Sequence, residues 1–166
     1  MPNYLFSTGK LSIAPVATVF DATHVIGAVQ SADFEHKMEV KEVREATFVS
    51  HFPVDNVMFD AAASLKIEAG EFAEKLIEYA TGAAKSSSGG NNVYTASTTA
   101  TIPYVKIKLE GKTSDGRNVT LEIARARAVS GLPLGMKRDS HTMPTVDFRV
   151  YPALVTDIPW VLTIAQ

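Results

Sequence analysis

The strongest constraint on the fold is a strict alternation of apolar and polar residues in two stretches of the chain. In residues 32–40, Phe34 and Met38 share one side with other apolar residues, and charged residues occupy the other side. Residues 57–69 repeat the pattern. Side chains of a β-strand point alternately to opposite faces, so a period of two predicts strands with one packed and one solvent-exposed face. We therefore expect a mainly antiparallel β protein.

The stretch that joins these two strands, residues 42–56, is too long for a tight hairpin turn. It is also more apolar than a solvent-exposed loop. The residues that mark it are Val43, Phe48, Val49, Phe52, Pro53, Val54 and Asp55. A long apolar loop usually covers another surface, so this one is expected to pack either on its own domain or on a neighbouring molecule.

A single helix is predicted in residues 71–81, where Phe72, Leu76 and Tyr79 form an apolar stripe. Glutamates near its start suit the positive end of the helix dipole, and Gly82 is well placed to end it. A lone amphipathic helix in a β chain is expected to lie across a sheet or to cap one end of a sandwich.

The remaining segments complete the predicted fold. Residues 83–95 are rich in Ser, Gly and Asn and predict a flexible loop. Residues 104–109 and 119–128 flank an Asp115-Gly116 turn and predict a hairpin, and residues 146–150 and 161–164 predict two further strands. The expected fold class is α+β, mainly antiparallel β: one domain over residues 1–166, a β-sandwich or barrel with one flanking helix.

No catalytic or metal-binding arrangement is visible in the sequence. Cysteine is absent, which removes disulfides, thiolate zinc sites and a cysteine nucleophile. Asp139, Ser140 and His141 are adjacent and cannot adopt the geometry of a hydrolase triad. None of the histidines has the spacing of a metal site; they are His24, His36, His51 and His141. The sequence predicts a protein that is not an enzyme and that needs no cofactor or metal.

The charge of the chain is nearly balanced. A net charge of −2 and a pI near 6.1 disfavour a protein that coats DNA, because such proteins normally carry a basic surface. The first residues lack the basic and apolar regions of a signal peptide, and no apolar stretch is long enough to cross a bilayer. We expect a soluble protein made in the cytoplasm.

Three short motifs precede the predicted helix in a fixed order. Residues 6–11 read FSTGKL, residues 27–30 read GAVQ and residues 52–55 read FPVD, with the alternating strands between and after them. In this order, residues 4–82 resemble the tail tube, or major tail, proteins of long-tailed phages. The later residues fit the family in kind only, as an antiparallel hairpin with closing strands.

The resemblance implies a β-sandwich flanked by a helix, whose copies form hexameric rings that stack into a tube. Residues 42–56 would be a stacking loop that reaches the next ring. Genomic DNA would pass through the lumen without specific binding. The implied partners are other copies of the chain, a tape measure protein, and tail terminator and tail-tip proteins, with no membrane. The implied location is the virion tail, after synthesis in the host cytoplasm.

The charged strand faces then become candidates for the wall of the lumen, because a polar wall of net negative charge repels phosphate at short range. The candidates are Asp33, Glu35, Lys37, Glu39, Lys41, Asp60, Ser64, Lys66 and Glu68. The alternative is that they form the solvent-exposed outer face of a sandwich.

Two other functions remain open from the sequence. The inner tube of a contractile injection or secretion system would share the same fold. A monomeric β-barrel that binds a ligand would need an aromatic-lined pocket, for which the chain offers only Trp160 and scattered tyrosines.

Overall fold

The computed structural model describes residues 9–44, 53–70, 73–97, 99–132, 144–152 and 158–166, with the backbone alone for residues 39–44 and 53–61. Strands dominate, and every strand pairing is antiparallel. The central strands are β1 Gly9–Pro15, β2 Val25–Arg44, β3 Pro53–Ala69, β6 Val105–Lys112, β7 Asn118–Ala128 and β8 Thr145–Val150.

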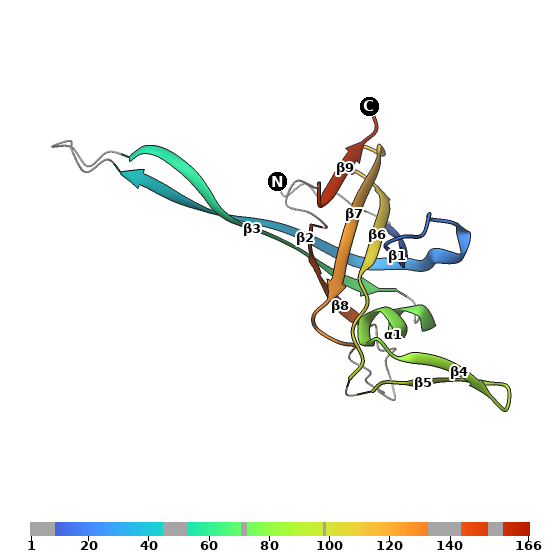
Figure 1. Ribbon diagram of the computed structural model, residues 1–166. Coiled ribbons are helices and arrows are strands. Elements are labelled where there is room, and N and C mark those ends of the chain that lie inside the picture. The colour runs from blue at the N-terminus through green and yellow to red at the C-terminus, as the bar shows by residue number, and fades with distance from the viewer. Residues whose placement is uncertain (1–8, 45–52, 71–72, 98, 133–143, 153–157) are drawn as a thin grey trace, which may run out of the picture.

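These strands form a closed barrel (Figure 1). The sheet order is β6-β1-β2-β3-β8-β7, and β6 also pairs with β7, so the 6 strands close on themselves. The prediction of a β-sandwich is therefore wrong, and of the two predicted architectures the barrel is the one observed. Closure depends on β1, which pairs with β2 along one edge and with β6 along the other.

The apolar faces of the strands fill the barrel. In β7, Val119, Leu121 and Ile123 alternate with more exposed neighbours, and in β8 Val146 and Phe148 do the same. The largest fully buried side chains are Phe148, Leu11, Ile13, Leu65, Ile67, Leu76, Ile107, Leu109, Leu121, Ile123, Val105 and Val119. A small barrel is normally filled by its own side chains, so this interior is a packed core.

The predicted strands are confirmed, and some are longer than expected. β2 and β3 extend the two alternating stretches, and β6, β7 and β8 match the later ones. A register shift between Glu39 and Val40 puts Val57 opposite Lys41. The alternation predicted to run through residues 57–69 is thus interrupted by a β-bulge at this point.

Three strands fall outside the barrel. β9, Trp160–Ile164, pairs with β7 beyond the end of β8. It confirms the strand predicted at residues 161–164. β4 Ala84–Ser88 and β5 Asn91–Thr95 form a separate two-stranded hairpin. Residues 83–95 were predicted as a flexible loop, and most of them instead form this regularly paired hairpin, whose residues are mostly exposed. Its flexibility stays a prediction.

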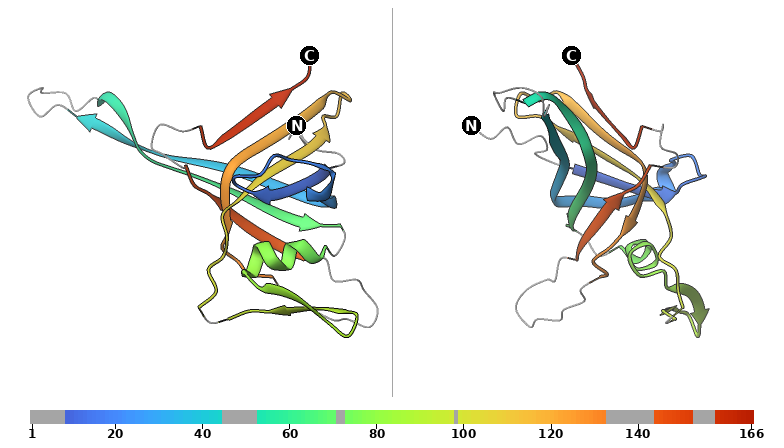
Figure 2. Two further views of the ribbon diagram at one scale, coloured as in Figure 1. Left: turned by 45° about the vertical axis from the view of Figure 1, so that its right-hand side comes forward. Right: turned by 60° about the vertical axis from the view of Figure 1, so that its left-hand side comes forward.

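The helix α1, Glu74–Thr81, lies at one end of the barrel beside the β4–β5 hairpin (Figure 2). It begins later than predicted and ends at Gly82 as predicted, with Gly82 in the left-handed conformation. Leu76 and Ala80 are buried in the core, and Tyr79 packs partly against it. The helix thus caps the barrel with one apolar stripe.

Replacing Gly82 by Ala should destabilise the protein. Gly82 has a φ of +69°, and an added Cβ would lie 2.9 Å from the carbonyl oxygen of Thr101. The left-handed backbone alone costs a non-glycine residue about 1–2 kcal/mol, and the contact adds to that. Urea denaturation should show this loss, whereas Gly89→Ala, where φ is +57° and no atom lies within 4 Å, should lose less. Equal losses would show that the Thr101 contact has no effect.

Candidate assembly interface

The most prominent feature outside the barrel is a two-stranded projection. β1 pairs with β2 only as far as Val29, and β8 pairs with β3 only from Ser64 onward. Ser64 lies opposite Glu35 in β2. Among the described residues, the rest of β2 and β3 pair only with each other. This segment, residues 36–44 and 53–63, is here called the arm, and it extends far from the barrel (Figures 1 and 2).

β2 contacts β9 at the base of the arm, and Met38 just beyond this contact is exposed. Trp160 of β9 packs edge-on against Phe34, with ring centroids 5.1 Å apart, and against His36 at 5.5 Å. Met38 follows on the same side of the strand and is 60% exposed. The apolar face that fills the barrel therefore continues onto the arm, where no barrel lies beneath it.

The opposite face of the same strands carries the lumen candidates. Asp33 lies opposite Lys66 and Glu35 lies opposite Ser64. Residues paired directly in antiparallel strands share a face, so these four lie together, and all are exposed. Lys37 joins them, with its Nζ 3.1 Å from Glu35 Oε2. The structure thus brings these candidates onto one outward face.

The other lumen candidates lie on the same two strands. Glu68 is near the barrel end of β3, where Ser31 Oγ donates a hydrogen bond to its Oε2 at 3.2 Å. On the arm, Glu39 lies opposite Asp60, and Lys41 lies in β2 beyond the register shift. Whether any of them lines a lumen stays a prediction, because a single subunit does not contain one.

The polar face continues onto β8, which the sequence reasoning did not include among the candidates. Asp147 lies opposite Lys66, and Arg149 lies opposite Ser64. Both alternate with buried residues in β8, so the period of two could have identified them. Only the pairing of β3 with β8, however, shows that they extend the same face.

The predicted stacking residues are divided between the strands and the segment that joins them. Val43 lies in β2 opposite Asp55. Pro53, Val54 and Asp55 all belong to β3. Phe48, Val49 and Phe52 lie outside the described residues. The connection predicted at residues 42–56 is therefore too long, because β2 continues to Arg44 and β3 begins at Pro53.

β9 is a second exposed strand and was not predicted as a functional surface. Val161, Leu162 and Ile164 are 48%, 39% and 41% exposed, although all three are apolar. Within the part of the chain that the structure describes, β9 pairs with β7 alone and lies at the end of the sheet order. An exposed apolar edge strand is a ready template for pairing with another chain.

A groove of about 220 Å³ adjoins β9. Trp160 and Val161 line it together with Phe20 and Ile158, and Lys106 stacks over the Phe20 ring at 4.4 Å. Its volume is below the several hundred Å³ of common small-molecule sites. The groove therefore gives little support to a ligand-binding module.

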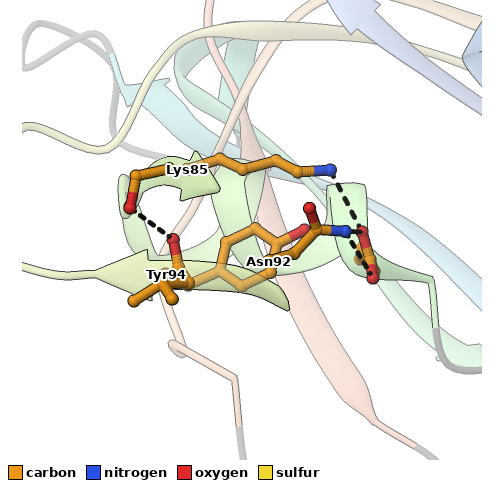
Figure 3. Close-up of polar contacts among 6 residues, drawn as sticks. Lys85, Asn92 and Tyr94 are labelled. Carbon is orange, nitrogen blue, oxygen red and sulfur yellow. Dashed lines mark hydrogen bonds and ion pairs between the residues drawn. The ribbon is translucent and has the colours of Figure 1, made fainter. Parts of the chain in front are cut away.

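Polar contacts hold the β4–β5 hairpin to the helix. Lys85, Asn92 and Tyr94 converge on the carboxylate of Glu74, the first residue of α1 (Figure 3). Tyr94 Oη donates to it at 2.8 Å, Asn92 Nδ2 at 2.9 Å and Lys85 Nζ at 3.1 Å. The Tyr94 bond, followed by those of Asn92 and Lys85, holds the pKa of Glu74 below its ordinary value. Glu74 is thus the link between hairpin and helix.

Removing this carboxylate should loosen the hairpin. Because the folded pKa of Glu74 is lowered, its contribution is present above the ordinary value of 4.5 and is lost as the pH falls through the lower folded pKa. In Glu74→Gln, the amides of β4 and β5 should exchange with solvent faster than in the parent protein at pH 7, with the barrel amides unchanged. Glu78→Gln, on the same helix, is the matched control. Equal hairpin exchange in both variants would contradict the assigned link.

The described residues form no recognisable reaction centre. In them, no group of three His, Cys, Asp or Glu side chains could hold a metal ion. His24 belongs to the short 3-10 helix Ala22–His24, where Asp21 and His24 form a reciprocal cap, and His36 packs on Trp160. His51 and His141 lie outside the described residues. That the protein is not an enzyme stays a prediction.

Neither a membrane-spanning helix among the described residues nor a known relative was found. No helix in the described part of the chain has the length and apolarity needed to span a membrane. Neither the models of known protein families nor the curated proteins give a match to this sequence.

Proposed function

We propose that this protein is the structural subunit of a phage tail tube. Its copies assemble into stacked, hexameric rings, and the tube carries the genomic DNA to the host. The motif order in residues 4–82 suggests this family. The observation that carries the proposal is the arm, which leaves the barrel and pairs with nothing else among the described residues.

The dimensions of the arm suit contact with a neighbouring copy. At roughly 3.3 Å per strand residue, the β2 half of the arm is about 30 Å long. A compact chain of this size has a radius of gyration of about 15 Å. The arm is therefore long enough to extend well onto the surface of a neighbouring copy.

The polar face of β2, β3 and β8 is the proposed wall of the lumen. It carries four acidic and three basic side chains: Asp33, Glu35, Glu68, Asp147, Lys37, Lys66 and Arg149. Phosphate binding needs a concentration of unpaired basic groups, and here the two signs are interspersed. Such a face would let DNA pass without retaining it.

This function places the protein in the virion tail, in contact with itself, a tape measure protein, and tail terminator and tail-tip proteins. The purified protein should form hollow filaments or rings in negative-stain electron microscopy, because the outer edges of the arm and of β9 pair with no strand among the described residues of one subunit. Analytical ultracentrifugation over a wide concentration range should show the matching large species. A single monomeric species at every concentration would contradict the proposal.

A further inference from the structure

The backbone hydrogen bonds define which groups of β9 remain available. Ala165 N donates to Asn118 O and Ala124 N donates to Pro159 O, both across the β7–β9 pair. Hydrogen-bonded pairs alternate along antiparallel strands, so the amides of Val161 and Thr163 also point toward β7. The amides of Trp160, Leu162 and Ile164 therefore point to the opposite, open edge.

The side chains of β9 make this edge apolar as well as open. Leu162 and Ile164 lie opposite Leu121 and Val119, which face the core of the barrel. They lie at the margin of that core and stay partly exposed, since no other described strand lies beyond β9 in the sheet order. A further strand along this edge would cover them and satisfy the free amides.

The arm has the complementary properties. Among the described residues the outer edges of its strands pair with nothing, and its core-facing side runs from Phe34 past His36 to the exposed Met38. The arm and β9 of one subunit extend in different directions (Figures 1 and 2), and their described residues do not pair with each other. We propose that the open edge of β9 in one copy binds the arm of a second copy, which adds to the β7–β9 sheet as a further strand.

This contact joins two different surfaces of identical chains. Such a heterologous contact builds closed rings or open filaments, whereas a self-complementary patch stops at a dimer. The inference rests on the proposed self-assembly and specifies which two surfaces meet. It also gives the open edge of β9 and the open edges of the arm a role, since each is the partner of the other.

Two sets of variants separate the two surfaces. Leu162→Pro removes an amide from the open edge and leaves the bonds to β7 in place, because proline is tolerated where the N–H faces outward. Ile164→Pro does the same near the end of the strand and serves if Leu162→Pro does not fold. Leu162→Ala keeps the amide and is the matched control. For the arm, residues 39–60 are replaced by Asn-Gly, which joins the directly paired Met38 and Ala61 by a two-residue turn.

The test mixes the two defective proteins. The proline variant keeps its arm and the shortened variant keeps its β9 edge. Each alone should be monomeric in analytical ultracentrifugation, and the mixture should give a 1:1 complex with the mass of two subunits. Leu162→Ala should still assemble on its own.

Three results would overturn this pairing. If the proline variant, folded by circular dichroism, still forms filaments, the β9 edge is not used. If the shortened variant dimerises by itself, β9 pairs with β9. If the mixture stays monomeric while the unaltered protein forms tubes, the arm binds elsewhere and the proposed function still stands.

Discussion

Shortening the arm should abolish assembly while the barrel stays folded. In the variant that replaces residues 39–60 by Asn-Gly, all strand pairs of the barrel are retained, because β8 contacts β3 only from Ser64 onward. The removed backbone pairs with no barrel strand in the part of the chain the structure describes, so the free energy of unfolding should change little. The filaments expected of the parent protein should disappear entirely, leaving a monomer in ultracentrifugation and empty fields in electron microscopy.

The control for this variant is a change at the polar face of the barrel itself. Lys66→Gln alters the proposed lumen wall without touching the arm, and it should leave filament formation intact. Assembly by the shortened variant would show that the arm is not needed for assembly. Loss of folding in it, seen by circular dichroism, would show instead that the arm stabilises the barrel, contrary to the observed pairing.

Phe148→Ala should produce the largest loss of stability. Phe148 is fully buried on β8, whose backbone pairs with both β3 and β7. Truncating a buried phenylalanine removes its apolar contacts and leaves a cavity, which costs about 3–5 kcal/mol. Proteins of this size have a total stability of about 5–15 kcal/mol, so the variant should lie close to unfolding at 37 °C. Urea denaturation followed by circular dichroism measures the change.

Val129→Ala is the matched comparison. Val129 directly follows β7 and is 57% exposed, so its truncation should change the free energy of unfolding by less than about 0.5 kcal/mol. A loss of under 1 kcal/mol for Phe148→Ala would mean that the barrel interior is not packed as described.

The period-two pattern predicted most of the strands, because alternation is a property of each strand alone and does not depend on its partners. Phe34 and Leu65 face the core because their strands alternate, and the Asp115-Gly116 turn predicts the β6–β7 hairpin from adjacent residues. β1 escaped prediction because Leu11, Ser12, Ile13 and Ala14 are all buried, so the strand does not alternate. β4 and β5 escaped because Ser, Asn and Gly favour turns, although here they pair as a hairpin.

The candidate site was only partly predictable for a similar reason. Asp33 and Lys66 were assigned to polar faces of separate strands, but their direct pairing depends on the β2–β3 register. The β9 edge carries no motif, since an apolar last strand is equally typical of a buried one. Its exposure follows from its position as the last described strand in the sheet order, which no local pattern encodes.

The sequence by itself determined that this is a mainly antiparallel β protein, with one helix ended by Gly82 and with polar and apolar strand faces kept apart. These properties follow from neighbouring residues, through strand alternation, helix periodicity and turn chemistry. Only the tertiary structure decided that the sheet closes into a barrel, and that the outer edges of the arm and of β9 pair with no other strand in the described part of the chain. Both depend on pairings between distant strands, above all that of β1 with β6. Strands with the same alternation can either close into a barrel or form one of two sheets packed face to face.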